Sequence, residues 1–321
     1  MLKKKAIWNI RSLSLALLVV GTGALTGCDD DDEADTPDPG VQYVSDLFAN
    51  EADYSLLRAA VRRAGYADTL KRPTITVFAP TNAAFQAAGF ADTTAISAAP
   101  QADIQNVLRY HIIGKRVEPS AFEQSGGSSE ATLGGSPVFL SRRADAKVFV
   151  NAAEVLSSNS QAANGIVYQV NKVLMPPVGN LLQVAQANPN LSLLAAAVRR
   201  GGTAVVNALS STGTPVTVFA PTNAAFQAAG YADTTAIGAA DPQQLATILT
   251  YHVVSGRLFS PSLTNGDLTT LQGGTATVAV NGSSVTITGK GNNNTAATVT
   301  QADLTATNGV VHVIDRVLLP Q

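Results

Sequence analysis

The strongest constraint on this chain is an internal repeat. Residues 76–96 and 217–237 are identical at 20 of 21 positions, at an offset of 141 residues. Shorter matches follow the same order along the chain: 56–63 with 193–200, 110–111 with 251–252, and 164–167 with 308–311. Each unit has about 140 residues, which is long enough to bury its own core. The repeat therefore predicts two globular domains in tandem, and not a solenoid of small units.

The boundaries of the two domains follow from the repeat and from one short linker. Residues 176–179 (PPVG) form a short, stiff segment between the two copies. We therefore expect a first domain over 41–178 and a second domain over 179–321.

Each unit begins with helical patterns and continues with strand patterns. Apolar residues recur at helical spacing in 56–61 and 104–112, and the second unit repeats both patterns. The β-branched run 74–78 predicts a strand, and the Ala79-Pro80-Thr81 segment is expected to break it. Later runs alternate as strands do, including a hairpin around Asn281-Gly282 and closing strands over 166–174 and 310–319. Helices followed by strands predict an α+β fold.

The first 27 residues have the layout of a secretory signal peptide. Four basic residues lie in 3–11, an apolar run spans 12–20, and small residues follow. The segment ends in Leu25-Thr26-Gly27-Cys28, which resembles the lipobox of bacterial lipoproteins. The resemblance implies removal of 1–27 and lipidation of Cys28, the only cysteine of the chain, which would make the membrane a partner through this anchor. An ordinary signal peptide with an incidental free cysteine is the alternative.

An acidic tether is expected over 28–40. These residues include seven acidic side chains and no basic one, so the segment repels itself and is extended. An acidic run directly after a lipidated cysteine resembles the surface-export signal of Bacteroidetes lipoproteins. The resemblance implies an exported outer-membrane lipoprotein that is exposed on the cell surface. Retention on an inner leaflet is the alternative.

Composition excludes several classes of function. Only 14% of the residues are charged, and 41–321 holds 17 basic and 16 acidic residues, so nucleic-acid binding is not expected. One cysteine and three histidines argue against a disulfide or a metal site built from these residues. No P-loop, nucleophile elbow, zinc-protease motif or dinucleotide fingerprint occurs. We therefore expect no catalytic site, no metal and no cofactor.

Three repeated motifs together resemble the fasciclin (FAS1) domain family. The strand-Pro-Thr-helix block lies at 76–85 and 217–226, the Tyr-His pair at 110–111 and 251–252, and the Asn-Gly motif at 164–168 and 308–312. The resemblance covers about 41–321. It implies that each domain is a β-sheet wedge packed with several α-helices. It also implies adhesion or matrix attachment at cell surfaces, without catalysis.

The candidate binding or structural residues come from two of these motifs. They are Tyr110, His111, Tyr251 and His252 of the Tyr-His pair, and Pro80, Thr81, Asn82, Pro221, Thr222 and Asn223 of the turn. In animal members of the family the Tyr-His motif is tied to integrin binding. The residue pattern favours a different role, because both histidines share an apolar helical stripe and are expected to be buried and hydrogen-bonded. The tyrosines lie one step round the helix and are expected to reach the rim.

The turn residues and one departure from the family pattern also have structural explanations. Proline stops a strand and threonine caps a helix, which accounts for the spacing of Pro80 and Thr81 without a ligand. Tyr168 stands where the family often has histidine, as the second copy does at His312. This difference argues against a chemical role for the position.

These observations predict a lipid-anchored cell-surface protein that mediates adhesion or matrix attachment. Its partner is expected to be an extracellular protein or polysaccharide, bound with added avidity by two modules. The alternative is an envelope lipoprotein that binds a carbohydrate or a small ligand.

Overall fold

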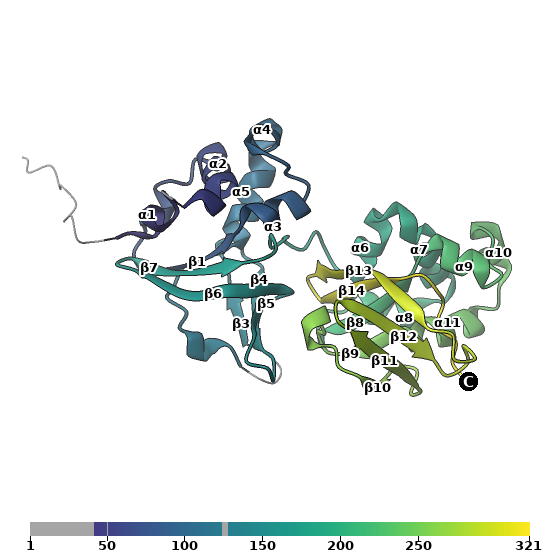
Figure 1. The fold of residues 1–321 in the computed structure, drawn as a ribbon. Helices are drawn as coiled ribbons and strands as arrows, with labels where there is room; N and C mark the ends of the chain where they lie inside the picture. The colour runs from purple at the N-terminus through teal and green to yellow at the C-terminus, as the bar shows by residue number, and fades with distance from the viewer. Residues whose placement is uncertain (1–41, 50, 124–127) are drawn as a thin grey trace, which may run out of the picture. The chain divides into compact units, whose positions relative to one another are not determined.

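The two sequence repeats fold into two domains with the same order of elements. A computed structural model describes residues 42–49, 51–123 and 128–321 (Figure 1). The predicted signal peptide, the lipidated cysteine and the acidic tether lie outside the described residues. Within that part of the chain, no helix is long and apolar enough to span a bilayer.

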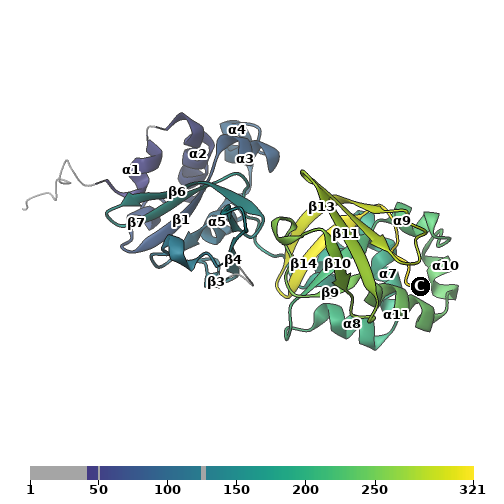
Figure 2. The same cartoon turned by 60° about the horizontal axis from the view of Figure 1, so that its bottom comes forward.

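The first domain combines five α-helices with seven strands among its described residues. Its helices are α1 (Val44–Ala49), α2 (Ser55–Ala64), α3 (Asn82–Ala87), α4 (Thr93–Ala98) and α5 (Gln101–Tyr110). Its strands are β1 (Ile75–Pro80), β2 (Ile112–Ile113), β3 (Ser128–Ala131), β4 (Pro137–Arg142), β5 (Val148–Val150), β6 (Ala153–Ala162) and β7 (Gly165–Val170). The helices pack around α2 at one side of the sheet, as two views show (Figures 1 and 2). The predicted α+β class is confirmed.

The second domain repeats this plan with one more helix. Its helices are α6 (Leu181–Ala187), α7 (Ser192–Arg200), α8 (Thr203–Ser210), α9 (Asn223–Ala228), α10 (Thr234–Ala239) and α11 (Pro242–Tyr251). Its strands are β8 (Val216–Pro221), β9 (Val253–Ser255), β10 (Gly266–Thr269), β11 (Thr275–Asn281), β12 (Ser284–Gly289), β13 (Ala297–Ala306) and β14 (Gly309–Ile314). The sequence did not predict α8, because its residues lie in the least similar part of the repeat.

Each domain forms a seven-stranded sheet whose two ends meet. The order is β2-β1-β7-β6-β5-β4-β3 in the first domain and β10-β11-β12-β13-β14-β8-β9 in the second. The pairs β1–β7 and β8–β14 are parallel, and the other pairs are antiparallel. The Leu133 N–H donates to the Ile112 carbonyl at 2.8 Å, and the Leu271 N–H donates to the Val253 carbonyl at 2.7 Å. These bonds close each sheet into a barrel-like form.

The last strand of each domain is buried on both faces. In β7, Ile166 and Tyr168 face the core of the barrel, whereas Val167 packs against the helices. All six residues of β14 are likewise buried. A strand covered on both faces needs apolar residues at nearly every position, which explains the continuous apolar runs in the sequence.

The closing strands are shorter than the sequence predicted. We expected strands over 166–174 and 310–319, but β7 ends at Val170 and β14 ends at Ile314. Each last residue pairs with the proline that ends the parallel partner strand, Pro80 or Pro221. Proline therefore ends the paired ladder. The expected break of the first strand was also placed too early, because β1 includes Ala79 and Pro80.

Candidate functional site

The histidine of each Tyr-His pair lies directly after a helix. The expectation that the helix includes His111 was wrong by one residue, because α5 ends at Tyr110 and His111 is its C-cap. His111 and His252 are each 1% exposed. The expectation that both are buried is confirmed, and neither side chain is available to a partner.

Both ring nitrogens of His111 have protein partners. Its Nδ1 lies 2.8 Å from the Val107 carbonyl, and the Leu174 N–H donates to its Nε2 at 2.9 Å. A carbonyl only accepts and an amide N–H only donates, so the ring is neutral with its proton on Nδ1. The ring therefore ties the end of α5 to the chain that follows β7.

His252 repeats this arrangement in the second domain. Its Nδ1 lies 2.8 Å from the Ile248 carbonyl, and its Nε2 accepts from the Leu318 N–H at 2.8 Å. Burial lowers the pKa of both His111 and His252 to about 4. Protonation would also place a new N–H against an amide N–H, so these histidines act as structural connectors and not as acid–base groups.

The tyrosines of the Tyr-His pairs are also buried. We expected them to reach the rim, but Tyr110 is 0% and Tyr251 is 1% exposed. The Tyr110 hydroxyl donates to the Pro137 carbonyl at 3.0 Å and accepts from Asn151 Nδ2 at 3.1 Å. The expectation was wrong because the closed sheet covers the end of the helix, and the sequence does not reveal this closure.

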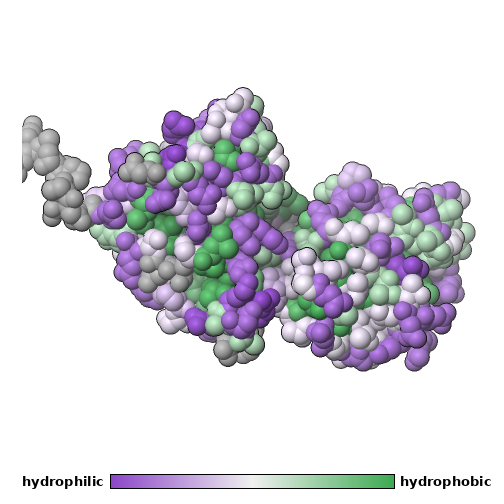
Figure 3. All heavy atoms as spheres, viewed as in Figure 1, coloured by the Kyte–Doolittle hydropathy of each residue, from purple (hydrophilic) through white to green (hydrophobic). Residues whose placement is uncertain are grey.

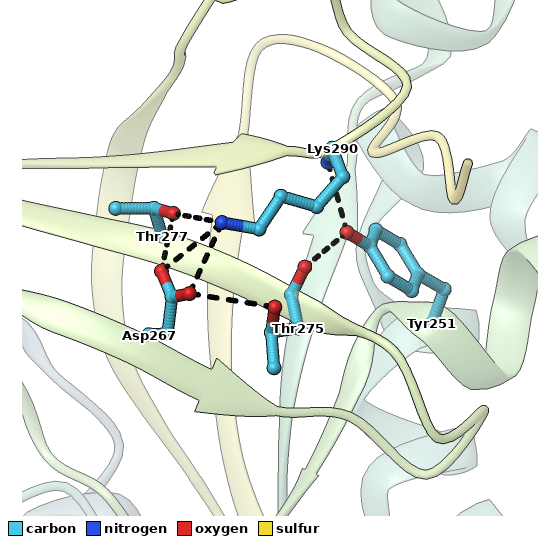
Figure 4. A network of polar contacts seen from close by, with 5 residues as sticks. All are labelled: Tyr251, Asp267, Thr275, Thr277 and Lys290. Carbon is cyan, nitrogen blue, oxygen red and sulfur yellow. Dashed lines mark hydrogen bonds and ion pairs between the residues drawn. The ribbon is translucent and has the colours of Figure 1, made fainter.

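Tyr251 joins a polar network at the surface of the second domain (Figure 4). Its hydroxyl donates to the Thr275 carbonyl and accepts from the Lys290 N–H at 3.0 Å. The Lys290 ammonium lies 3.0 Å from both Asp267 Oδ2 and Thr277 Oγ1. Hydrogen bonds from Thr277 and Lys290 lower the pKa of Asp267.

A cavity of about 460 Å³ adjoins this network. It is lined by Tyr251, Gln272, Gly273, Gly274, Thr275, Lys290, Pro320 and Gln321. Its charged and phenolic groups already have protein partners, and Gln272 Oε1 accepts from the Gly274 N–H at 2.9 Å. The network joins β10, β11 and the residue after β12, and its geometry does not specify a ligand.

The Pro-Thr-Asn turns position two helices each. Thr81 Oγ1 accepts from the Ala84 N–H at 3.1 Å, which confirms the predicted cap of α3. Asn82 reaches the preceding helix, where its Oδ1 accepts from the Leu56 N–H at 3.0 Å. Thr222 and Asn223 make the same two contacts with Ala225 and Leu193. These interactions account for the residue types of the turn.

Asn164 and Asn308 hold the start of each domain against its last hairpin. Asn164 Oδ1 accepts from the Val44 N–H at 2.9 Å, and its Nδ2 donates to two backbone carbonyls, of Leu70 and Arg72. Asn308 makes the matching bonds to Leu181, Leu209 and Ser211. The Asn-Gly motif pointed to these positions, but their buried polar role becomes visible only in the fold.

We expect Asn308→Ala to lower the free energy of unfolding of the second domain by about 2–3 kcal/mol, because three backbone groups lose their partner. Urea denaturation of the two variant proteins measures the change. Asn207→Ala is the matched control, since Asn207 is exposed in α8 and alanine favours a helix. Equal stability of the Asn308 and Asn207 variants would contradict the assigned role.

Tyr168 and His312 perform the same task with different side chains. The Tyr168 hydroxyl donates to the Val117 carbonyl at 2.8 Å, and His312 Nε2 lies 2.8 Å from the Leu258 carbonyl. Each ring stacks on a buried phenylalanine of the neighbouring strand, Phe78 or Phe219 in turn. The departure at Tyr168 therefore preserves a structural contact, and burial raises the pKa of Tyr168 to about 12.

Ser260, Asp303 and His312 lie close together but do not form a catalytic triad. The Ser260 hydroxyl donates to Asp303 Oδ2 at 2.6 Å. His312 uses its Nδ1 for the Asp303 backbone N–H at 3.3 Å and its other nitrogen for a carbonyl. A triad needs a serine–histidine hydrogen bond, which these contacts do not provide. Among the described residues, no three His, Cys, Asp or Glu side chains are grouped as a metal site requires.

A comparison with family models identifies the two domains. The Fasciclin domain model matches residues 52–176 and again residues 189–320. This chain belongs to the fasciclin-domain family. Both matched segments fall within the domain ranges expected from the repeat, and the seven-stranded sheets with their helices are two FAS1 domains.

Curated relatives and a solved structure are similar to this fasciclin chain. Transforming growth factor-beta-induced protein ig-h3 of Sus scrofa is 29% identical over 246 residues, which cover 76% of this chain and 34% of that protein. Cell surface glycolipoprotein MPB83 of Mycobacterium bovis is 38% identical over 110 residues, covering 34% and 47%. A FAS1 domain pair from the insect cell adhesion molecule Fasciclin I gives a TM-score of 0.42 at 19% identity, covering 83% and 97%. The chain thus spans about a third of the length of ig-h3.

In this fasciclin chain, the family's signature residues mainly organise the domain. The Tyr-His pairs, the Pro-Thr-Asn turns and the Asn-Gly motifs all direct their polar atoms to buried or local backbone groups. A binding surface must therefore be sought among exposed side chains outside these contacts.

Proposed function

We propose that this fasciclin-domain chain is a lipid-anchored cell-surface protein that mediates adhesion or matrix attachment through its two domains. The observation that carries the proposal is the order of its parts. Two fasciclin domains follow a segment with the layout of a signal peptide that ends in Leu25-Thr26-Gly27-Cys28. This order suits domains that are exported and held at a membrane.

Comparisons support the adhesive and the surface part of the proposal. Fasciclin domains are linked to cell adhesion. The relative MPB83 is described as a cell surface glycolipoprotein. A lipidated N-terminus contributes about 0.8 kcal/mol for each buried methylene, so more than one acyl chain holds a protein stably at a bilayer.

The anchor is tested by Cys28→Ser. We expect the variant to lose labelling by a radioactive fatty acid and to move from the membrane fraction to the soluble fraction, because serine lacks the thiol that carries the lipid. Thr26→Ser is the matched control, because it changes a neighbouring residue and keeps Cys28. Unchanged membrane association and labelling of the Cys28 variant would overturn lipid anchoring at this residue.

Adhesion and surface display are tested in cells. We expect a deletion strain to attach less to its surface or to neighbouring cells, and expression of the full chain to restore attachment. Protease added to intact cells should cleave the protein. Normal attachment of the deletion strain would overturn the adhesive role, whereas full protection from protease would overturn surface display.

A further inference from the structure

Both domains share a set of exposed residues on two short helices and the turn between them, although the exposed Ser97 of α4 is replaced by Gly238 in α10. We name these surfaces the α3–α4 face and the α9–α10 face; Figure 1 labels the helices. The α3–α4 face consists of Ala83, Gln86, Ala87, Ala88, Gly89, Ala91, Asp92, Thr93 and Thr94, and the α9–α10 face of Ala224, Gln227, Ala228, Ala229, Gly230, Ala232, Asp233, Thr234 and Thr235. Every one of these positions is exposed and identical in the two domains.

The helix that follows each face, α5 in the first domain and α11 in the second, does not share this identity of exposed residues. The exposed positions of α5 are 101, 102, 103, 106 and 109, and the corresponding residues of α11 differ at all of them. The buried positions of the same two helices keep similar apolar residues. Packing therefore explains similarity in the core, but it does not explain identity on one exposed face beside divergence on another.

Folding requirements account for only part of the α3–α4 face. Gly89 and Gly230 have φ angles of 94° and 93°, which disfavour other residues. Asp92 Oδ1 caps α4 by accepting from the Ala95 N–H at 2.8 Å. The hydroxyls of Thr93 and Thr94, in contrast, make no hydrogen bond to a described residue. The alanines and threonines of the face thus lack a structural reason for being retained.

The chemistry of the two faces favours an uncharged partner rich in hydroxyl groups. Each face offers threonine hydroxyls without a hydrogen bond to a described residue, and its only charged side chain caps a helix. Its glutamine is held in place, because the amide nitrogen donates to the Ala91 carbonyl at 3.4 Å in the first domain and to the Ala232 carbonyl at 3.2 Å in the second. Figure 3 shows mostly pale green and purple residues over α10, as expected for alanine with polar residues. Large anchors such as Trp or Arg, which dominate protein–protein hot spots, are missing from the residues of both faces. One half-buried aromatic ring, Phe90 or Tyr231, lies within each segment.

We propose that the α3–α4 face and the α9–α10 face each bind one stretch of the same neutral polysaccharide. A polymer of identical units lets one chain occupy both faces, whereas a single small ligand gains nothing from the duplication. Two weak contacts with one polysaccharide chain then give a much higher apparent affinity than either contact alone. The inference rests on the proposed adhesive function and names the class of its partner.

Charge introduced on the faces tests the proposal. The variants are Ala87→Arg with Thr94→Arg in the first domain, Ala228→Arg with Thr235→Arg in the second, and all four together. Asn106→Arg with Thr247→Arg is the matched control, because it places the same charge on exposed positions of α5 and α11 that differ between the domains. Thr94→Lys with Thr235→Lys is a milder second set in case the arginine variants unfold.

Binding is measured with the full chain in detergent on immobilised α-mannan, dextran, cellulose and β-1,3-glucan. We expect retention on at least one of these polymers, a loss of at least about tenfold in apparent affinity for either single-domain variant, and no retention of the combined variant. The control should bind as the native protein does. Absence of retention on all four polymers, or unchanged binding of the combined variant, would overturn the proposal.

Cell attachment separates this inference from the proposed function. If the deletion strain loses attachment while polysaccharide binding is absent, the polysaccharide partner is wrong and the adhesive function stands. If the deletion strain attaches normally, the adhesive function itself is wrong.

Discussion

Gly309→Ala is expected to lower the free energy of unfolding of the second domain by more than about 4 kcal/mol. Gly309 begins β14 and pairs with Val216 of the parallel strand β8. A Cβ atom at this position would collide with the Val216 carbonyl oxygen and would lie 2.9 Å from a Leu181 methyl group. Both obstacles belong to the packed interior, so relief requires separation of β8 from β14.

Hydrogen exchange resolved by mass spectrometry measures this effect in each domain. We expect peptides from β8 and β14 to lose protection and the melting temperature of their domain to fall by roughly 15 °C. Gly238→Ala is the matched control, because Gly238 is exposed in α10 and nothing lies within 4 Å of an added Cβ. The control should be neutral or more stable by about 0.5–1 kcal/mol. Similar protection in both variants would show that the close approach at Gly309 is not required.

Acid is expected to destabilise the first domain through His111, its only histidine. Burial lowers the pKa of His111 to about 4 from its ordinary value of 6.5. Between these values the unfolded chain binds a proton that the folded chain does not, so stability falls as the pH decreases. The contribution is fully present above about pH 6.5 and is lost by about pH 4, which amounts to about 3 kcal/mol.

His111→Gln provides the test of this pH dependence. Urea denaturation is carried out between about pH 7 and pH 4, with NMR signals of the first domain as the probe of its unfolding. For each protein it gives the slope of the free energy of unfolding against pH. We expect the variant to be less stable than the native protein near pH 7 and to lose less stability on acidification. Asp145, whose pKa is lowered to about 2 by its hydrogen bond with Arg143, titrates below this window. Equal slopes for the two proteins would contradict the role of His111.

Much of the fold was predictable because the internal repeat and the spacing of apolar residues can be read directly from the sequence. The threonine cap at Thr81 and the buried stripe of α5 were read from spacing alone, and the structure confirms both. The ends of the closing strands were not, because β7 ends where its parallel partner reaches Pro80, which is far away in sequence. The helix α8 was missed because the corresponding segment of the first repeat differs in sequence and forms only a short 3-10 turn, Thr69–Lys71.

The roles of the motif residues depended on contacts that sequence spacing does not contain. The burial of His111 was predictable from its apolar neighbours, but its partner Leu174 lies 63 residues further along the chain. The burial of Tyr110 follows from closure of the sheet, where Leu133 bonds to Ile112, a contact that the spacing of apolar residues does not reveal. The residues of the α3–α4 and α9–α10 faces were visible in the sequence as part of the repeat. Only the structure shows that these residues are exposed and do not belong to the repeated core.

The asparagine contacts have a consequence for how these domains carry mechanical load. The chain enters each domain beside its last hairpin, where Ala163 N–H donates to the Gln42 carbonyl at 2.8 Å and Thr307 N–H to the Gly179 carbonyl at 2.9 Å. If the chain is anchored at its N-terminus and binds a distant surface, as proposed, tension reaches these bonds and Asn164 or Asn308 first. We therefore expect the first helix to detach before the parallel strands separate. Each domain would then lengthen under force while its sheet remained closed.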